Sequence, residues 1–300
     1  MPVINNVAVV GASGSLGAPV LSAIINSGKF NVTVVSREGS TATFSPSVKV
    51  IRADYTSVES VAAAFKGQDA VVSTVGSHGL AGQTVFVDAA IAAGVKRILP
   101  SEFGSDLNNA LTSKLPVHAP KIAVRKHIEE KIKAGADITY TYVNNGAFID
   151  WGLEMGFLLD WKEGKPKIYD GGEQLFSAVT LASVGQAVVG VLGHLDETKN
   201  RTVYIQDMTT SQSRILEIAK KVAPTKKWEP IYVKTSDIKK DSDEKMAKGE
   251  VTIPTIISYL FVGLFGEGYG GQFEKLDNDL LGLTGKSEDV IEETWKKLLL

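Results

Sequence analysis

The chain has 300 residues, of which 44% are hydrophobic and 22% charged, and its formal net charge is −2. This composition predicts a globular protein with a substantial core, and it argues against nucleic acid or a membrane surface as partner. The chain has no cysteine, which excludes disulfides, thiol catalysis and cysteine-ligated metals. The apolar runs are too short to span a bilayer, and the start lacks the features of a secretory leader, so we expect a cytoplasmic protein.

The first motif of the chain is a glycine-rich turn after a short apolar run. The run Val3–Val10 predicts a strand, and three glycines at a spacing of three residues follow it. Glycines let the backbone approach phosphate groups, and the free N–H groups of a following helix point at them. This turn is therefore a candidate pyrophosphate site, although glycines that serve packing alone would look the same. Its candidate residues are Gly11, Ser13, Gly14, Ser15, Leu16 and Gly17.

The first helix is predicted over 15–27. Pro19 fits only the first turn of a helix, which places the helix start near Ser15 to Leu16, directly on the glycine turn. Gly28 is typical of a helix end.

The next strand, Asn31–Val35, ends in Ser36 and Arg37. Folds that bind NAD usually place an Asp or Glu there, whereas a guanidinium suits the 2′-phosphate of NADPH. Arg37 therefore favours NADPH. The neighbouring Glu38 argues for NADH, because an acidic side chain could bind the ribose 2′-hydroxyl instead. After the third strand, Asp54 is a candidate adenine contact, or else the cap of a helix that starts near Ser57.

Short apolar runs alternate with helical patterns through the first half of the chain. Strands are predicted at 48–51, 70–75, 95–99 and 138–143, and helices at 57–66, 82–93 and 120–134. Such alternation predicts an α/β fold, a Rossmann doubly wound parallel sheet with helices on both faces. We expect residues 1–150 to form an NADP-binding domain.

The second half has a looser pattern. Helices are predicted at 149–160, 181–193 and 211–222, a strand at 202–206, and a final helix at the end of the chain. We expect 177–222 to return to the first sheet. Residues 151–176 and 223–300 are expected to form a smaller C-terminal α/β lobe that binds substrate over the carboxyl edge of the sheet.

The catalytic pair of most short-chain dehydrogenases is missing. None of the eight tyrosines has a lysine four positions later, so the motif Y-x-x-x-K does not occur. If the chain is a reductase, its acid/base group is arranged differently.

Five segments resemble the isoflavone reductase-like group of atypical short-chain dehydrogenases, which is akin to the NmrA-like proteins. They are residues 69–76, 82–84, 96–104 with the run L-P-S-E-F-G, 121–129 and 140–148. The group includes isoflavone, pinoresinol–lariciresinol and phenylcoumaran benzylic ether reductases and the eugenol synthases. The likeness covers about the first half of the chain, is faint beyond residue 150, and looks more like a fungal or microbial branch than a plant enzyme.

The resemblance implies an NADPH-dependent reductase of small aromatic or phenolic compounds, with Lys121 as the catalytic acid/base. From the residues alone, Lys121 has no preference over Lys126 on the same predicted helix. Its place after Pro120, in the first helical turn, would lower its pKa.

Residues that follow the strands are candidates for holding the nicotinamide half of the cofactor. They are Val75, Gly76, Ser77, Ser101, Glu102, Phe103, Lys121, Asn145 and Phe148. For Glu102, a hydrogen bond that fixes its loop is the favoured alternative. Candidates for the substrate pocket are His118, Phe148, Trp151 and Met155, each of which a core position would also explain. His78 and His118 are candidate proton relays, and no metal site is predicted.

A second hypothesis is a non-catalytic NADP(H)-sensing regulator that binds a protein partner, as NmrA-like proteins do. Lys121 and the run L-P-S-E-F-G favour the reductase, because a sensor needs no acid/base group. The sequence leaves monomer and homodimer equally open.

Overall fold

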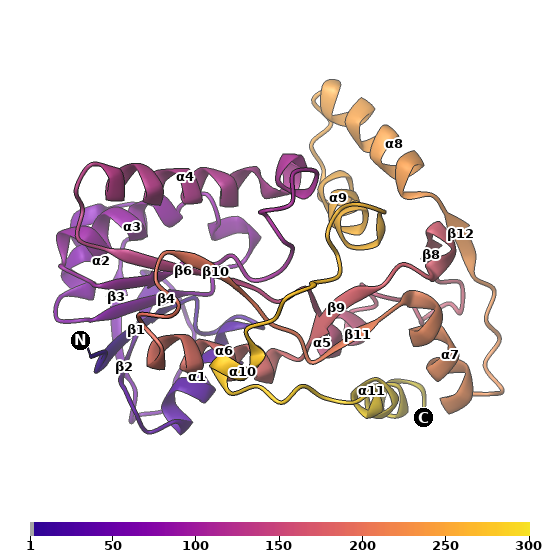
Figure 1. Cartoon of the computed structure of the whole chain (residues 1–300), viewed down its shortest axis with the longest axis horizontal. Coiled ribbons are helices and arrows are strands. Elements are labelled where there is room, and N and C mark those ends of the chain that lie inside the picture. Colours follow the sequence, from indigo (N-terminus) through magenta and orange to yellow (C-terminus); the bar gives the residue numbers. More distant parts are fainter. Residues whose placement is uncertain (1–2) are drawn as a thin grey trace.

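A seven-stranded parallel sheet forms the larger part of the computed structural model, which describes residues 3–300 (Figure 1). Residues 1 and 2, which the predicted first domain includes, lie outside the described part. The strand order is β10-β6-β5-β4-β1-β2-β3, so the chain runs outward in both directions from β1 and β4, as in a Rossmann-like sheet. The strands are β1 (Asn6–Val10), β2 (Asn31–Arg37), β3 (Lys49–Ala53), β4 (Ala70–Ser73), β5 (Arg97–Leu99), β6 (Thr139–Asn144) and β10 (Arg201–Tyr204).

Helices cover both faces of this sheet, which confirms the predicted α/β fold. α2 (Val58–Phe65), α3 (Gln83–Ala92) and α4 (Ala119–Lys133) lie on one face, and α1 (Gly17–Asn26) and α6 (Leu181–Gly193) lie on the other (Figure 1). Each face has its own core, because the strands bury apolar side chains on both sides. α1 and α6 approach closely at Gly185, where a Cβ would lie 2.8 Å from that of Ala23.

The second half of the chain builds two small sheets beside the large one. One has the order β11-β9-β7 and the other pairs β12 with β8. Their strands are β7 (Ala147–Phe148), β8 (Lys167–Tyr169), β9 (Phe176–Val179), β11 (Met208–Thr210) and β12 (Ile231–Val233). Around them lie α5 (Ile149–Glu154), α7 (Gln212–Val222) and α11 (Asp289–Leu299), with a core that includes the fully buried Trp295 and Phe176.

Two expectations for this half need correction. Within 177–222 only β10 pairs with the large sheet, whereas β9 and β11 belong to a small sheet and α7 packs on α11. α5 ends at Glu154 rather than at residue 160, because Gly156 adopts a left-handed conformation with φ of +69° that stops the helix.

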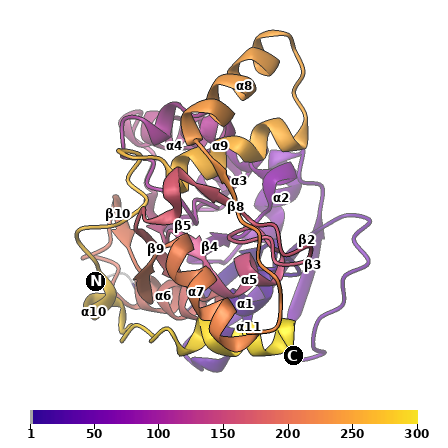
Figure 2. The ribbon, with the colours of Figure 1, turned by 90° about the vertical axis from the view of Figure 1, so that its right-hand side faces the viewer.

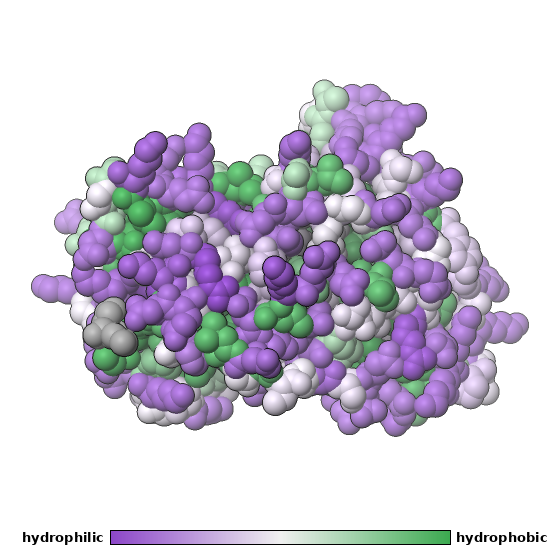
Figure 3. All heavy atoms as spheres, viewed as in Figure 1, coloured by the Kyte–Doolittle hydropathy of each residue, from purple (hydrophilic) through white to green (hydrophobic). Residues whose placement is uncertain are grey.

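The remaining helices are α8 (Thr235–Ala247), α9 (Ile253–Phe265) and the short α10 (Asn278–Leu281). α8 projects from the body of the molecule in both views (Figure 1 and Figure 2), and hydrophilic side chains cover most of it (Figure 3). It is fixed to α9 by the Tyr259 hydroxyl, which donates to Asp243 Oδ1 at 2.7 Å. Within residues 3–300, no helix is long and apolar enough to cross a membrane.

Candidate active site

The glycine turn connects β1 to α1 at the carboxyl edge of the sheet. Gly11 has a φ of +80°, and a Cβ there would lie 2.8 Å from the carbonyl carbon of Thr74. At Gly17 a Cβ would overlap the Gly11 carbonyl oxygen. The turn is closed by the Gly14 N–H, which donates to that oxygen at 3.0 Å. α1 begins at Gly17 after Leu16 as N-cap, so the predicted helix start is confirmed within about one residue.

A cavity of about 480 Å³ lies between this edge and the second half of the chain. The loops after β1, β4, β5 and β6 of the large sheet supply one side, and α9 with aromatic side chains supplies the other. Of the predicted residues it is lined by Gly14, Ser15, Leu16, Val75, Gly76, Ser77, Ser101, Phe103, His118, Lys121, Phe148 and Trp151, and further lining comes from Phe157, Leu260, Gly263, Leu264 and Phe273. The size and the apolar lining with a few polar groups are typical of a small-molecule site.

Several predicted residues lie outside this lining. Met155 is 61% exposed and points to solvent, so its prediction as a pocket residue is wrong. His78 is also exposed, on a short 3-10 helix (Ser77–Gly79). Asn145 is buried behind Gly146, whose carbonyl accepts from its side-chain amide at 3.0 Å. Gly11, Ser13 and Gly17 belong to the glycine turn without lining the cavity.

Lys121 stands in the first turn of α4 with its amine at the cavity. Its Nζ donates to the main-chain carbonyl of Glu102 and, at 3.3 Å, to that of Phe103. Lys126, which the sequence could not tell from it, is exposed and pairs with Glu130 on the same helix. The fold therefore distinguishes the two lysines by burial.

Burial lowers the pKa of Lys121, and the nearby charge of Arg125 lowers it further, while Glu102 opposes the shift. An ammonium loses more solvation than a neutral amine on entering an apolar site, which is the physical origin of the main effect. The shift brings the amine closer to the range in which it can exchange a proton with a ligand.

The Glu102 side chain does not line the cavity but pairs with Arg125 of α4. Its Oε2 lies 2.8 Å from Nη2 of Arg125 and accepts from Nε of the same guanidinium at 3.0 Å. Nη1 of Arg125 donates to Asn108 Oδ1 at 2.9 Å, and its guanidinium carbon lies 4.3 Å from the centre of the Tyr142 ring. The Glu102 side chain makes the bond that holds its loop to α4, as the favoured alternative expected. Glu102 does not line the cavity, and a cofactor contact through its main chain stays a prediction.

Hydrogen bonds tie the loops after β4, β5 and β6 together. Ser101 Oγ donates to the Val75 carbonyl at 2.8 Å, and the Ser101 N–H donates to Oε1 of the buried Gln83 at 2.7 Å. The Gly104 carbonyl accepts from the Gly146 N–H at 3.0 Å. The three loops therefore form one rigid floor under the cavity.

The end of β2 carries the predicted cofactor selector. Ser36 is buried and Arg37 exposed. Sequence reasoning missed Arg52 on the adjacent β3, whose Nη1 donates to Ser36 Oγ at 3.5 Å and to the carbonyl of Ser40. The parallel register that pairs Ser36 with Arg52 is a tertiary fact, so only a correct sheet assignment could have found it.

Asp54 follows β3 at the same edge. Its Oδ1 accepts from the Thr56 N–H at 2.9 Å, and both the N–H and the hydroxyl of Thr56 lower its pKa. The N-cap of α2 is Ser57, whose hydroxyl accepts from the Ser60 N–H. The expectation of Asp54 as helix cap is therefore wrong, and the adenine contact stays a prediction.

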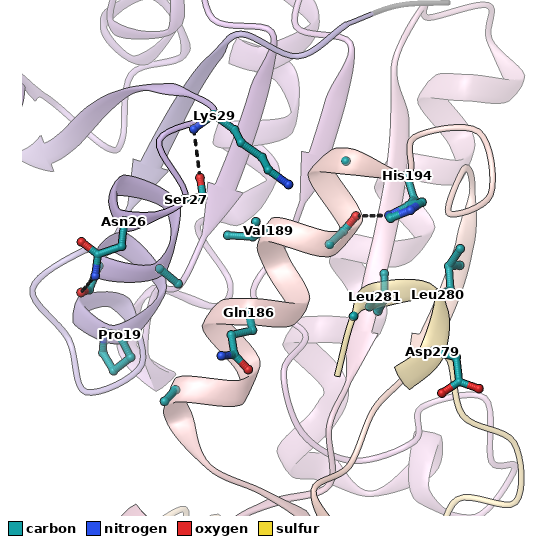
Figure 4. A pocket seen from close by; sticks show the side chains of 16 residues that line it. Pro19, Asn26, Ser27, Lys29, Gln186, Val189, His194, Asp279, Leu280 and Leu281 are labelled. Atoms are coloured by element: carbon teal, nitrogen blue, oxygen red, sulfur yellow. Dashed lines mark hydrogen bonds between the residues drawn. The ribbon is translucent and has the colours of Figure 1, made fainter. Parts of the chain in front are cut away.

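A second hollow of about 770 Å³ lies on the outer face, between α1 and α6. Figure 4 shows Pro19 and Asn26 from α1 on one side and Gln186 and Val189 from α6 on the other. The His194 ring bonds through Nδ1 to the Gly190 carbonyl at 2.9 Å. The residues that line this hollow include neither Lys121 nor any Phe, Tyr or Trp, so the smaller cavity is the candidate active site.

The parallel sheet with a glycine turn at its switch point defines a Rossmann-like fold, and the relatives place the chain among the oxidoreductases. The chain matches the NmrA-like family model over residues 4–250, and it belongs to that family. Oxidoreductase poxI of Penicillium oxalicum is 32% identical over 291 residues, covering 93% of this chain and 90% of that protein. Isoflavone reductase homolog P3 of Arabidopsis thaliana is 34% identical over 160 residues, covering 48% of this chain and 49% of that protein.

The fold also has solved counterparts. The structure described as AtPrR2 with NADP+ and (+)pinoresinol superposes with a TM-score of 0.80 at 24% identity, over 100% of both chains. The predicted resemblance to the isoflavone reductase-like group is confirmed. The family match to residue 250 extends well beyond the first half of the chain, where the resemblance was expected to end.

Proposed function

We propose that this protein is an NADPH-dependent reductase of a small aromatic or phenolic substrate, with Lys121 as its acid/base. The observation that carries the proposal is the Lys121 amine, which stands in an apolar cavity beside the glycine turn with a lowered pKa. The relative named an oxidoreductase and the NADP+-bound structural counterpart support it.

Two observations support the binding of NADPH by these residues. Gly11 and Gly17 let the backbone turn tightly from β1 into α1, because a Cβ at either would clash with neighbouring main chain, and the helix start that follows has N–H groups that favour an anion. Arg37 and Arg52 bring two positive charges to the end of β2 and β3, where the 2′-phosphate of NADPH would be held. NADPH, when bound, supplies a hydride and is itself oxidised to NADP+.

The chain's own residues supply the proton and the surroundings. Lys121 exchanges a proton with the substrate, directly or through water, so that hydride and proton together reduce a conjugated alkene, a quinone methide or a carbonyl. Phe148, Trp151 and Phe157 exclude water and hold an aromatic ring. The carbonyls of Glu102 and Phe103 keep the amine in place.

The test is NADPH oxidation with a panel of aromatic enones, aldehydes and allylic esters. We expect Lys121→Met to lose at least about a hundredfold in kcat while it still binds NADPH. Lys126→Met is the matched control on the exposed face of α4. Turnover that survives in Lys121→Met would overturn the role of this lysine. A wild type without turnover that binds NADPH and NADP+ equally and captures a protein partner would favour the sensing regulator.

A further inference from the structure

The cavity contains a second polar side chain that the proposed reaction does not use. His118 is the N-cap residue of α4, one helical turn before Lys121, and it is only 2% exposed although its ring lines the cavity. Its Nε2 is buried without a hydrogen-bond partner among residues 3–300. A buried polar nitrogen in this state is unfavourable, and a ligand that supplies a partner recovers the loss.

The residue of α9 that faces this nitrogen is Gly263, which has no side chain to cover it. A Cβ added to Gly263 would lie 4.0 Å from His118 Nε2, 3.3 Å from Leu115 Cδ1 and 3.9 Å from Thr112 Cγ2. We call the space between Gly263 and His118 the α9 notch. Of the three atoms that such a Cβ would approach, two are carbons and the third is the imidazole nitrogen, which is therefore the polar group closest to the glycine.

The charge state of His118 restricts what the notch accepts. Burial lowers the pKa of His118 to about 3, and the positive charges of Lys121 and Arg125 act in the same direction. A neutral imidazole presents one N–H and one lone pair, and which of the two nitrogens carries the proton depends on the tautomer. A hydroxyl group can both donate and accept, so it satisfies either tautomer, whereas a carbonyl satisfies only one.

We propose that the α9 notch receives a hydroxyl group on the aromatic ring of the substrate, and that His118 selects hydroxylated rings over their methyl ethers and unsubstituted counterparts. The inference rests on the proposed reductase function. It makes His118 a specificity residue that contacts substrate, in place of the proton relay expected from the sequence.

The experiment compares 4-hydroxybenzylideneacetone with its methyl ether and with benzylideneacetone, all conjugated ketones. We expect the wild type to prefer the hydroxylated compound by about tenfold or more in kcat/KM, because the other two leave the nitrogen unpaired. His118→Phe removes the nitrogen and Gly263→Ala fills the notch, so both should bring the ratio close to unity. His118→Gln, which keeps a hydrogen-bonding group, should restore part of the preference. Ser258→Ala, on the outer side of α9, should keep the wild-type ratio.

A binding measurement separates this inference from the reductase proposal. The same three compounds are titrated into NADP+-loaded protein by calorimetry. A wild type that reduces none of them but binds the hydroxylated one more tightly, with loss of this preference in His118→Phe, would count against reduction of these ketones and would support the role of His118 in binding. A wild type without preference in both measurements, or a preference that persists in both His118→Phe and Gly263→Ala, would overturn the inference.

Discussion

Glu102 and Arg125 form an ion pair next to Lys121, with Nη2 and Oε2 2.8 Å apart and side chains only 1% and 9% exposed. Arg125 lies one turn after Lys121 on α4, and Glu102 supplies a carbonyl to the Lys121 amine through its main chain. The pair therefore acts on the lysine in two ways, through its opposed charges and through the position of the loop.

The substitution Glu102→Gln tests the first of these. The Glu102 carboxylate raises the pKa of Lys121 against the larger effect of burial, so its neutralisation should lower that pKa further. The pH at which kcat/KM changes should move to a lower value than in the wild type. An unchanged pH profile would show that the pair does not reach the amine.

The same variant leaves Arg125 without a counter-charge in a buried place. We expect a loss of roughly 3 kcal/mol in the free energy of unfolding, measured by urea denaturation. The control is Asp137→Asn, which breaks an exposed pair with Lys96 and should change stability by less than about 1 kcal/mol.

Cofactor choice is tested at the end of β2. Arg37→Ala should lower the preference for NADPH over NADH by about ten- to a hundredfold, since charge-assisted bonds to a phosphate contribute roughly 1.5–3 kcal/mol. Arg52→Ala should also lower the preference for NADPH, because Arg52 holds the loop between β2 and β3 through the carbonyls of Ser40 and Ala42. Lys49→Ala removes a charge at the opposite end of β3 and should leave the ratio of kcat/KM values unchanged. Equal ratios in all three variants would contradict the assignment.

The glycine turn is tested by Gly17→Ala. The added Cβ would overlap the Gly11 carbonyl oxygen, so the turn has to open and its phosphate contacts are lost. We expect the Kd for NADPH, measured by fluorescence titration, to rise at least about tenfold. Gly193→Ala at the end of α6, where a Cβ meets nothing within 4 Å, should bind as the wild type does.

The lowered pKa of His118 predicts how the free energy of unfolding depends on pH. Its pKa is about 3 in the folded protein, against an ordinary value of 6.5 in the unfolded chain. As the pH falls below 6.5, the unfolded chain takes up this proton first, so the free energy of unfolding decreases by up to about 1.4 kcal/mol per pH unit. The urea midpoint of His118→Phe should therefore fall less between pH 7 and about pH 5 than that of the wild type. The exposed His78→Gln should keep the wild-type difference, and a fall in His118→Phe as steep as in the wild type would contradict the shift.

The sequence predicted the large sheet well because its signals are local. Alternating apolar runs, the glycine turn and Pro19 each depend on a few neighbouring residues, and β1 to β6 follow from them. The prediction from sequence failed where strand pairing depends on segments that are far apart in the chain. The small sheet that joins β7, β9 and β11 combines residues up to about sixty positions apart, and no local pattern announces that pairing.

The site divides in the same way. The lining by Ser101 and Phe103 was predicted from their place after a strand, and that by Lys121 from the family resemblance. Arg52 and Gly263 became visible only through register and packing. Met155 was predicted to line the pocket as an apolar residue, but it is the C-cap of α5 and is exposed to solvent.

Both acceptors of the Lys121 amine are main-chain carbonyls, whereas much of the opposite cavity wall comes from side chains between residues 260 and 273. Both carbonyls belong to the loop after β5, which α9 does not contribute to, so changes in α9 reshape the cavity wall without removing an acceptor of the amine. The residues that hold the Lys121 amine are therefore different from those that form the opposite wall of the cavity. A library of variants confined to α9 and residues 270–273 should thus exchange one substrate for another without rebuilding the reaction.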